Sequence, residues 1–323
     1  MPKKLNGTQF VLFFITFLSL ASCNREMAVK SGVAKGNDTP PSYKLDSKNG
    51  CFVMGIVGGS KVDETSPLGN HLLLIRSTFQ NNTPGSTEKI EVICTGTLIK
   101  KNSVLTAAHC FYKSNYTLIF SSINASKDLL CSSGFNKSLI FEITSQNIHP
   151  KYNPIKDKSL EDITPEYDLA VVHFEGSLPA NYMPLNINES GIKKIKDTKN
   201  LELIIAGYGQ ISTQSKLPPE LRFAKKQQSQ ILISQFIPSA KKEIDLINQK
   251  GIFGLKKNDS KNFCHGDSGG PLLINTESGL EILGIASFLV GNKKNTICED
   301  GNMYYTEISE FPDHVEWIKE VIQ

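Results

Sequence analysis

The sequence predicts an all-β protein that ends in a single helix. From Ile56 onward, short runs rich in β-branched and aromatic residues alternate with Gly, Pro, Asn, Asp and Ser. Runs of this kind between turn residues are typical of strands, and many of them in series indicate a barrel or a sandwich. Helical periodicity is clear only over the last stretch of the chain, residues 312–322.

The expected strands follow one another at short intervals. They are His71–Arg76, Ile90–Ile93, Thr97–Ile99, Ser103–Leu105, Leu118–Phe120, Leu139–Ile143, Leu169–Phe174, Leu201–Ala206, Gln230–Ile233, Leu272–Ile274, Ile282–Ser287 and Met303–Ile308. The C-terminal helix is expected to begin near Pro312, because proline is favoured in a first helical turn. Val315, Ile318 and Ile322 then fall on one helix face. A second, short helix is expected over Lys241–Leu246.

The N-terminus has the pattern of a secretory signal peptide over residues 1–22. Lys3 and Lys4 precede an apolar run from Phe10 to Leu20, which is shorter than the ~20 residues of a confident membrane-spanning helix. The run ends in Leu-Ala-Ser-Cys, which resembles the bacterial lipobox, whose cysteine, here Cys23, is lipidated. We therefore expect a periplasmic or cell-surface lipoprotein. Ordinary signal cleavage is the alternative, and it would give a secreted protein in which Cys23 is a chance residue or a disulfide partner.

The cysteine count favours the lipid anchor. The chain has 7 cysteines, and setting Cys23 aside leaves an even number for disulfides in an exported protein. Residues 24–50 are polar and have no apolar periodicity, so they cannot form a core. The expected organisation is a signal peptide over 1–22, a lipid-anchored linker or pro-segment over 23–55, and one domain over 56–323.

Charge and histidine spacing exclude several classes of partner. The formal net charge is only +3, which gives no basis for nucleic-acid binding or for attraction to a membrane surface. Contact with a membrane is therefore expected through the lipid anchor alone. His71, His173 and His314 have no metal-ligand spacing, so no metal site is predicted. We expect a monomer.

Three segments carry residues suited to catalysis, in the order Thr106–Cys110, Tyr167–Ala170 and Gly266–Pro271. The last places a serine on a glycine-flanked turn, where its hydroxyl and the neighbouring backbone N–H groups can reach a substrate. These segments, in this order, resemble the chymotrypsin/trypsin family of serine proteases. The resemblance covers residues 56–321 and implies two six-stranded antiparallel β-barrels, with the active site between them and a C-terminal helix.

The resemblance implies a serine endopeptidase. Ser268 would be the nucleophile, His109 the general base, and Asp168 the group that orients the imidazole. The backbone N–H groups of Gly266 and Ser268 would form the oxyanion hole. No metal or organic cofactor is implied. The alternative is a catalytically silent protease-fold protein that serves in binding.

Activation is expected at Ile56. Ile56–Gly59 resembles the mature N-terminus that zymogen cleavage exposes, and the resemblance implies that its ammonium pairs with Asp267. The preceding residue is Gly55 rather than Lys or Arg, so either a protease that is not trypsin-like cleaves after Gly55 or activation is non-standard. Alternatively, Ile56–Gly59 is simply a first strand and cleavage does not occur.

The residues aligned with the specificity pocket are unusual. Asn262 stands where trypsin-like enzymes carry an aspartate, and a neutral amide cannot pair with a Lys or Arg side chain of the substrate. Leu289 and Met303 replace glycines, which predicts a shallow pocket that favours small aliphatic residues. The strand that carries Ser287 and Phe288 is expected to pair with the substrate backbone.

The resemblance also implies two disulfides, Cys94–Cys110 and Cys264–Cys298. Cys51 and Cys131 are left over, and a bridge between them would keep a cleaved pro-segment attached. Their connectivity is not readable from the sequence. The expected partners are a polypeptide substrate, an activating protease and, as a further candidate, a protease inhibitor.

Overall fold

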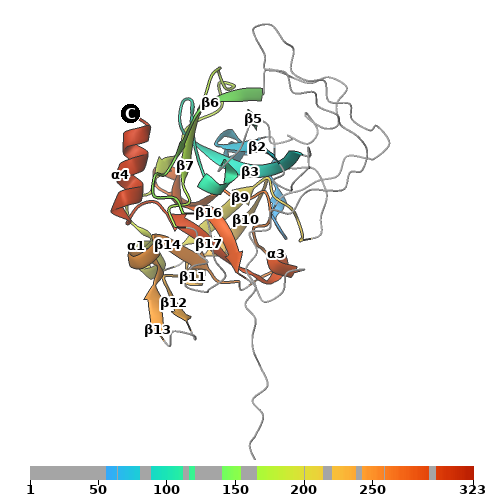
Figure 1. The fold of residues 1–323 in the computed structure, drawn as a ribbon. Coiled ribbons are helices and arrows are strands. Elements are labelled where there is room, and N and C mark those ends of the chain that lie inside the picture. Colours follow the sequence, from blue (N-terminus) through green and yellow to red (C-terminus); the bar gives the residue numbers. More distant parts are fainter. Residues whose placement is uncertain are drawn as a thin grey trace, which may run out of the picture.

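The computed structural model describes residues 56–63, 65–80, 89–111, 116–120, 140–153, 166–199, 201–213, 220–237, 242–257, 259–290 and 296–323. Within these residues the chain is mostly strand with a few short helices, which confirms the predicted fold class (Figure 1). Several predictions lie outside the described residues, namely those for the signal peptide, Cys23, the linker over 23–55, Cys51 and Cys131. No helix in the described ranges is long and apolar enough to cross a bilayer.

The first half of the molecule is a closed six-stranded barrel with the strand order β2-β3-β4-β7-β6-β5. All neighbouring strands in it are antiparallel. Its strands are β2 (Leu72–Gln80), β3 (Lys89–Lys100), β4 (Ser103–Thr106), β5 (Tyr116–Phe120), β6 (Ile140–Ile148) and β7 (Ala170–Phe174).

The two runs predicted at Ile90–Ile93 and Thr97–Ile99 belong to one strand, β3. Gly96 lies between the two runs, and its role is in packing. A Cβ atom there would come within 2.4 Å of Val104 and 2.8 Å of Ile75. The glycine therefore allows β2, β3 and β4 to pack closely without ending the strand.

The second half is a nine-stranded curled sheet with the order β1-β10-β9-β15-β16-β17-β14-β11, in which β8 pairs with β16. Six of its strands are longer than two residues: β9, β15, β16 and β17 lie where the sequence predicted strands, whereas β10 and β14 were not predicted. Of the three strands of two residues, β11 lies within the predicted run Gln230–Ile233, and β1 and β8 were not predicted. The longer strands are β9 (Glu202–Gly207), β10 (Arg222–Gln227), β14 (Ile252–Leu255), β15 (Pro271–Thr276), β16 (Gly279–Val290) and β17 (Asn302–Glu307). The short ones are β1 (Ser60–Lys61), β8 (Asn186–Ile187) and β11 (Ile231–Leu232). Among the described strands this sheet does not close, because its last strand, β11, pairs only with β14.

The predicted helix over Lys241–Leu246 is wrong. Lys242–Asp245 forms β13, which pairs with β12 (Ser234–Ile237) in a separate two-stranded ribbon that projects from the second half (Figure 1). The helix α2 (Leu246–Lys250) begins only after Asp245, whose carboxylate accepts hydrogen bonds from the first-turn N–H groups. An aspartate in this role marks a helix start, so the helix begins only at Leu246, the end of the predicted segment.

The C-terminal helix is confirmed as α4 (Pro312–Val321). The other helices, α1 (Ile192–Asp197) and α3 (Ile297–Asp300), are short and were not predicted. Although α4 follows the second half in sequence, its fully buried Ile318 belongs to the hydrophobic cluster of the first barrel. The helix therefore ties the two halves together.

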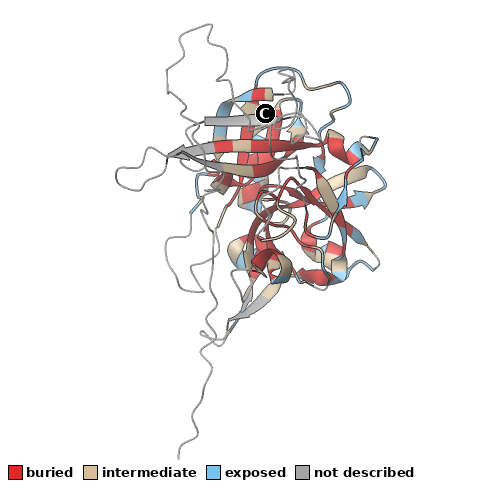
Figure 2. Cartoon of the chain, turned by 90° about the vertical axis from the view of Figure 1, so that its right-hand side faces the viewer, coloured by how far each residue is buried: buried red, intermediate tan, exposed pale blue. Residues whose placement is uncertain are grey.

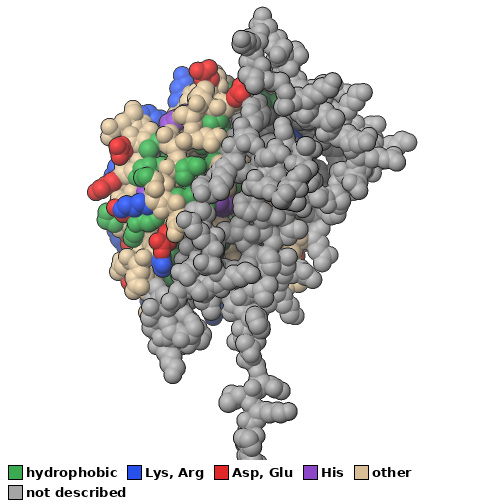
Figure 3. Space-filling view, in the orientation of Figure 1, with side chains coloured by type: hydrophobic (Ala, Val, Ile, Leu, Met, Phe, Trp, Pro, Cys, Tyr) green, Lys and Arg blue, Asp and Glu red, His purple; other side chains and the backbone are tan. Residues whose placement is uncertain are grey.

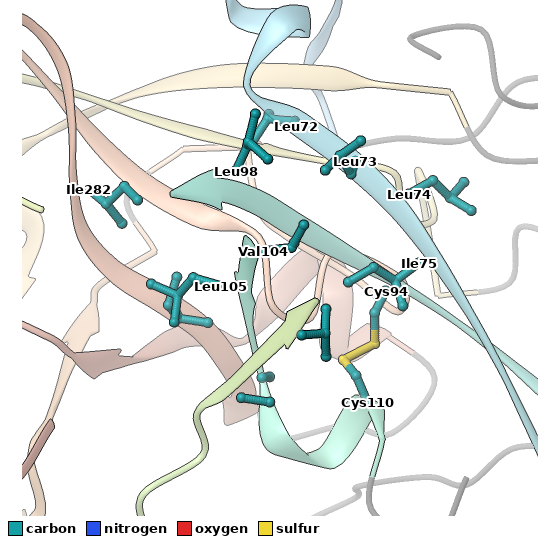
Figure 4. Close-up of a cluster of buried hydrophobic side chains, with 14 of the residues drawn as sticks. Leu72, Leu73, Leu74, Ile75, Cys94, Leu98, Val104, Leu105, Cys110 and Ile282 are labelled. Carbon is teal, nitrogen blue, oxygen red and sulfur yellow. A yellow bond between two sulfur atoms is a disulfide. The ribbon is translucent and has the colours of Figure 1, made fainter. Parts of the chain in front are cut away.

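The hydrophobic core is shared by the two halves. Buried residues lie along the strands of both halves (Figure 2). The cluster inside the first barrel includes Leu72, Leu98 and Leu105, and it receives Ile282 from β16 of the second half (Figure 4). Burying a side chain of this size contributes ~1.5–3 kcal/mol, so the shared core fixes the interface on which the site is built.

The exposed surface carries charges of both signs. In the described part of the face shown in Figure 3, basic and acidic side chains are interspersed and form no single-sign patch. This distribution agrees with the small net charge of +3.

Candidate active site

The three sequence segments meet where the two halves adjoin. His109 lies in a short 3-10 turn, Ala108–Cys110, directly after β4, and Asp168 lies just before β7. Strands β4 and β7 pair so that Thr106 faces Ala170, which brings the two segments together. Ser268 lies in the turn before β15, which belongs to the second half.

His109 and Asp168 form a buried pair. Asp168 has no exposed surface, and its Oδ2 accepts a hydrogen bond from Nδ1 of His109 at 2.7 Å. Its Oδ1 accepts the backbone N–H of His109 at 2.9 Å. With the Nδ1 proton directed at the carboxylate, the Nε2 atom of His109 is left as the basic nitrogen. Burial lowers the pKa of His109, but the charge and hydrogen bond of Asp168 outweigh it and raise the pKa above its ordinary value.

Ser287 completes this pair, because its hydroxyl donates to Oδ2 of Asp168 at 2.5 Å. The sequence placed Ser287 only on the substrate strand. The β16–β17 ladder shifts register between Ala286 and Phe288, which leaves Ser287 as the extra residue of a bulge. Bulges re-aim side chains next to active sites, and this one turns the Ser287 hydroxyl to the carboxylate.

Strands from both halves hold the turn that carries Ser268. The carbonyl of Ser268 accepts the N–H of Thr95 in β3 at 2.8 Å, and the Thr95 hydroxyl donates to the carbonyl of Gly266 at 3.0 Å. From the other side, the N–H of Gly269 donates to the carbonyl of Ala286 in β16 at 2.8 Å. Thr95 carries no motif, so its part in the site was not visible in the sequence.

Two backbone donors of this turn have no internal partner. Among the described residues, the N–H groups of Gly266 and Ser268 donate to nothing, while the carbonyls of both residues are hydrogen-bonded. Gly266 has φ +98°, and a Cβ there would lie 2.8 Å from the Cα of Gly209. Only glycine fits this backbone. Two unpaired N–H groups beside a serine are what an oxyanion hole presents before substrate binds.

Two disulfides brace the site. Cys94–Cys110 joins β3 to the turn of His109, with an S–S distance of 2.04 Å. Cys264–Cys298 joins the segment leading to Gly266 to α3. In each, both sulfurs lie near a histidine nitrogen, but sulfurs bonded to each other are not the thiolates that bind metals.

The segment expected to be the mature N-terminus lies beside the pocket residues. Ile56 is buried, and the backbone of Val57 pairs with that of Asn262 through hydrogen bonds of 2.9 and 3.1 Å. Asp267 is also buried, and it accepts N–H groups of Gly209 at 2.7 Å and Cys264 at 2.8 Å. Burial raises the pKa of Asp267 to about 7, although those hydrogen bonds act in the opposite direction. Within the described ranges no basic side chain contacts this carboxylate.

The expected pocket residues lie together, and their polar groups are engaged internally. The Asn262 amide donates to the carbonyl of Gly301 at 2.8 Å. The sulfur of Met303 accepts the N–H of Phe263 at 3.4 Å, and both Asn262 and Met303 have no exposed surface. Leu289 faces Met303 across the β16–β17 ladder.

Phe288 stacks on Tyr304 with ring centroids 4.8 Å apart. The side chain of Phe288 is therefore packed into the protein, so at this residue it is the backbone that remains for a substrate. This arrangement agrees with a strand that binds by main-chain pairing.

The family model for trypsin matches residues 75–315, which is well over half of the chain. The chain belongs to the trypsin family. Curated relatives match the chain at modest identity. Phenoloxidase-activating factor 3 of Holotrichia diomphalia is 29% identical over 256 residues, covering 71% of this chain and 64% of that protein. Chymotrypsin-like elastase family member 1 of Canis lupus familiaris is 26% identical, covering 71% of this chain and 81% of the relative.

Serine protease SP24D of Anopheles gambiae is 24% identical and covers 94% of this chain and 93% of its own length. The coverage therefore differs between relatives, and the chain spans less than two thirds of phenoloxidase-activating factor 3. Of the site residues described above, those from Cys94 to Tyr304 lie within the matched residues 75–315, and Ile56 and Val57 lie before them.

Proposed function

We propose that the chain hydrolyses peptide bonds in polypeptides, with Ser268 as nucleophile. The observation that carries the proposal is the buried Asp168–His109 pair, which leaves the basic nitrogen of His109 available beside a serine turn with two unpaired N–H donors. A serine hydroxyl is a weak nucleophile until such a base takes its proton.

The reaction consists of two steps, formation of an acyl-enzyme and its hydrolysis. The Oγ of Ser268 attacks the carbonyl carbon while Nε2 of His109 takes the hydroxyl proton, and the imidazolium then protonates the leaving amine. This gives an acyl-enzyme, which water cleaves by the same route, regenerating the hydroxyl and releasing the acid. The N–H groups of Gly266 and Ser268 bind the oxyanion in both steps, and one such donor is worth ~2.7–4 kcal/mol.

We propose that cleavage after Gly55 activates the enzyme. A new ammonium on Ile56 would enter the protein and pair with Asp267. The buried position of Ile56 supports this step, as does the raised pKa of Asp267, because that carboxylate ionises unfavourably until a cation reaches it.

We propose a small or apolar residue on the acyl side of the cleaved bond. Asn262 offers no charge to a basic side chain, and Met303 and Leu289 fill the place of glycines. One of the relatives is named as a chymotrypsin-like elastase, which is compatible with this preference.

The disulfides Cys94–Cys110 and Cys264–Cys298 indicate an oxidising compartment, which agrees with export. Lipidation at Cys23 would hold the enzyme at a membrane, with residues 24–50 as a tether. A Cys51–Cys131 bridge would keep the domain attached to that tether after cleavage at Gly55. The partners of the proposed enzyme are polypeptide substrates, an activating protease and inhibitors, and the enzyme would act as a monomer.

The test is labelling with a fluorophosphonate probe, which reacts only with a serine whose base and oxyanion hole are assembled. The chain with Ile56 as its N-terminus is compared with the Ser268→Ala variant, and intact mass after reduction defines each N-terminus. Labelling that is lost in the variant is expected. No labelling of the correctly processed chain would instead support the catalytically silent binding protein.

A further inference from the structure

Tyr167 has an unusual backbone directly beside the candidate catalytic carboxylate. Its φ is +56°, and it is the non-glycine residue with a positive φ among the described residues. Left-handed backbone is disfavoured for residues with a side chain, and most of all for bulky ones. Such a conformation persists only where the surroundings hold it, and it occurs preferentially at functional sites.

An aromatic cluster holds the Tyr167 ring. The ring stacks on His149 with centroids 4.7 Å apart and planes 19° apart, and it meets His314 edge-on at 5.2 Å. Phe311 approaches it at 5.8 Å, and the Tyr167 hydroxyl donates to Oδ2 of Asp313 at 3.1 Å. Three of these four partners lie on α4 or at its N-cap, so the C-terminal helix supplies most of the contacts.

The two histidines of the cluster are themselves fixed. Nδ1 of the fully buried His314 donates to the carbonyl of Glu307 at 2.5 Å. His149 accepts the N–H of Lys151 at 3.2 Å through Nδ1 and donates to the carbonyl of Asp313 at 3.4 Å through Nε2. Each ring therefore has one orientation, and the surface offered to Tyr167 is rigid.

The chain from Tyr167 to the carboxylate is short and tightly turned. The N–H of Leu169 donates to the carbonyl of Tyr167 at 2.7 Å, so the backbone folds back across Asp168. The carbonyl of Leu169 in turn accepts the N–H of His149 at 3.0 Å. The direction in which the Asp168 side chain leaves the backbone is thus set by this turn and by the ring that anchors it.

We propose that Tyr167 is a positioning residue: the cluster around its ring holds the left-handed turn and thereby directs the Asp168 carboxylate at Nδ1 of His109. The inference rests on the proposed function, because its kinetic consequence appears in peptide hydrolysis. Tyr167 acts through Asp168 and does not contact the substrate.

A series of substitutions separates the ring from the backbone. Tyr167→Ala removes the ring and keeps the side-chain penalty for a positive φ, whereas Tyr167→Gly removes both. Tyr167→Phe keeps the stacking and loses only the bond to Asp313. The matched control is Phe141→Ala, which deletes a buried ring that packs on Phe174 at 5.1 Å inside the first barrel.

We expect Tyr167→Ala to lower kcat by about 10- to 100-fold with KM nearly unchanged, because small displacements of catalytic groups cost factors of this size. Tyr167→Gly should retain more activity than Tyr167→Ala. The kcat of Tyr167→Phe should stay within about threefold of wild type. Phe141→Ala should lower stability more than it lowers kcat. A Tyr167→Ala variant with the kcat of wild type would overturn the proposal. So would equal kcat losses in Tyr167→Ala and Phe141→Ala.

A second readout does not depend on turnover. In the Ser268→Ala background, proton NMR follows the Nδ1–H of His109, and the imidazole titration gives its pKa. Asp168 raises that pKa, so Tyr167→Ala should weaken the Nδ1–H resonance and lower the pKa, while Phe141→Ala changes neither. Unchanged spectra in Tyr167→Ala and Tyr167→Gly would refute the positioning role. If wild type fails to react with fluorophosphonate, the proposed function fails, and these spectra still test the positioning.

Discussion

At the scale of single residues, Asp267 makes the clearest prediction about pH. Its carboxyl is buried without a cation in the described structure, and its pKa of about 7 lies above the ordinary 3.8. Because the folded state holds the proton more tightly than the unfolded state, stability falls as pH rises from about 4 to about 7. The total loss is on the order of 4 kcal/mol, since each pKa unit is worth about 1.4 kcal/mol.

Asp267→Asn should remove this pH dependence in the chain that has not been cleaved before Ile56. Thermal unfolding between pH 4 and 8 measures the slope for both proteins. In the cleaved chain the Ile56 ammonium would neutralise Asp267, so the slope of the wild type should flatten there too. The same slope in the wild-type and Asp267→Asn precursors would show that Asp267 does not ionise as described.

His314 predicts the opposite dependence on pH. Burial lowers the pKa of His314 to about 4, and the charges of His149 and Lys151 act in the same direction. The hydrogen bond to the carbonyl of Glu307 and the charge of Asp313 act against this shift. The Nε2 atom of His314 has no hydrogen-bond partner among the described residues. The folded state therefore favours the neutral ring, and the stability that it contributes is complete above pH 6.5 and is lost as pH falls toward 4. The loss is on the order of 3 kcal/mol.

His314→Gln, which keeps a donor for the carbonyl of Glu307, should be less stable than wild type at pH 7.5 and should lose less stability on acidification. Urea unfolding at pH 7.5 and 5 checks this. Parallel losses in the two proteins would contradict the role given to His314.

At the scale of elements, β10 shows why one strand was missed. Its sequence, Arg-Phe-Ala-Lys-Lys-Gln, is too charged to indicate a strand of a core sheet. The side chain of Lys226 is nevertheless fully buried, and its Nζ donates to Asp259 at 2.7 Å and to the carbonyl of Lys261 at 2.5 Å. This pair ties β10 to the loop that leads to Asn262, and a sequence does not reveal such a partner 33 residues away.

The pair predicts an asymmetry between its two truncations. Asp259→Ala leaves the Lys226 ammonium buried without its counter-charge, and burial already lowers the pKa of that lysine. Lys226→Met leaves only the partly exposed Asp259 and one carbonyl. Asp259→Ala should therefore cost about 2–3 kcal/mol and Lys226→Met about 1 kcal/mol. Chemical denaturation measures both, and the reverse order would contradict the account.

At the scale of the whole molecule, the sequence predicted what depends on contiguous residues. Gly266–Pro271 and Thr106–Cys110 are local motifs that resemble those of a known family, and from this resemblance the proximity of His109 to Asp168 could be expected. The fold class could be expected from the short strand-like runs, and the C-terminal helix from its own apolar spacing. Thr95, the Ser287 bulge and the Tyr167 cluster were missed because each depends on contacts between distant segments. The nine-stranded form of the second sheet was missed for the same reason, since the two-residue strands β1 and β8 have no pattern of their own.

Peptide-bond hydrolysis by Ser268 is tested by incubating a denatured protein with the chain that begins at Ile56 and identifying the new N-termini by mass spectrometry. Ser268→Ala, processed to the same N-terminus, is the matched control. We expect wild type to cut after small or apolar residues and the variant to make no cuts. Equal cleavage by Ser268→Ala, or none by correctly processed wild type, would show that Ser268 is not the nucleophile of a peptidase.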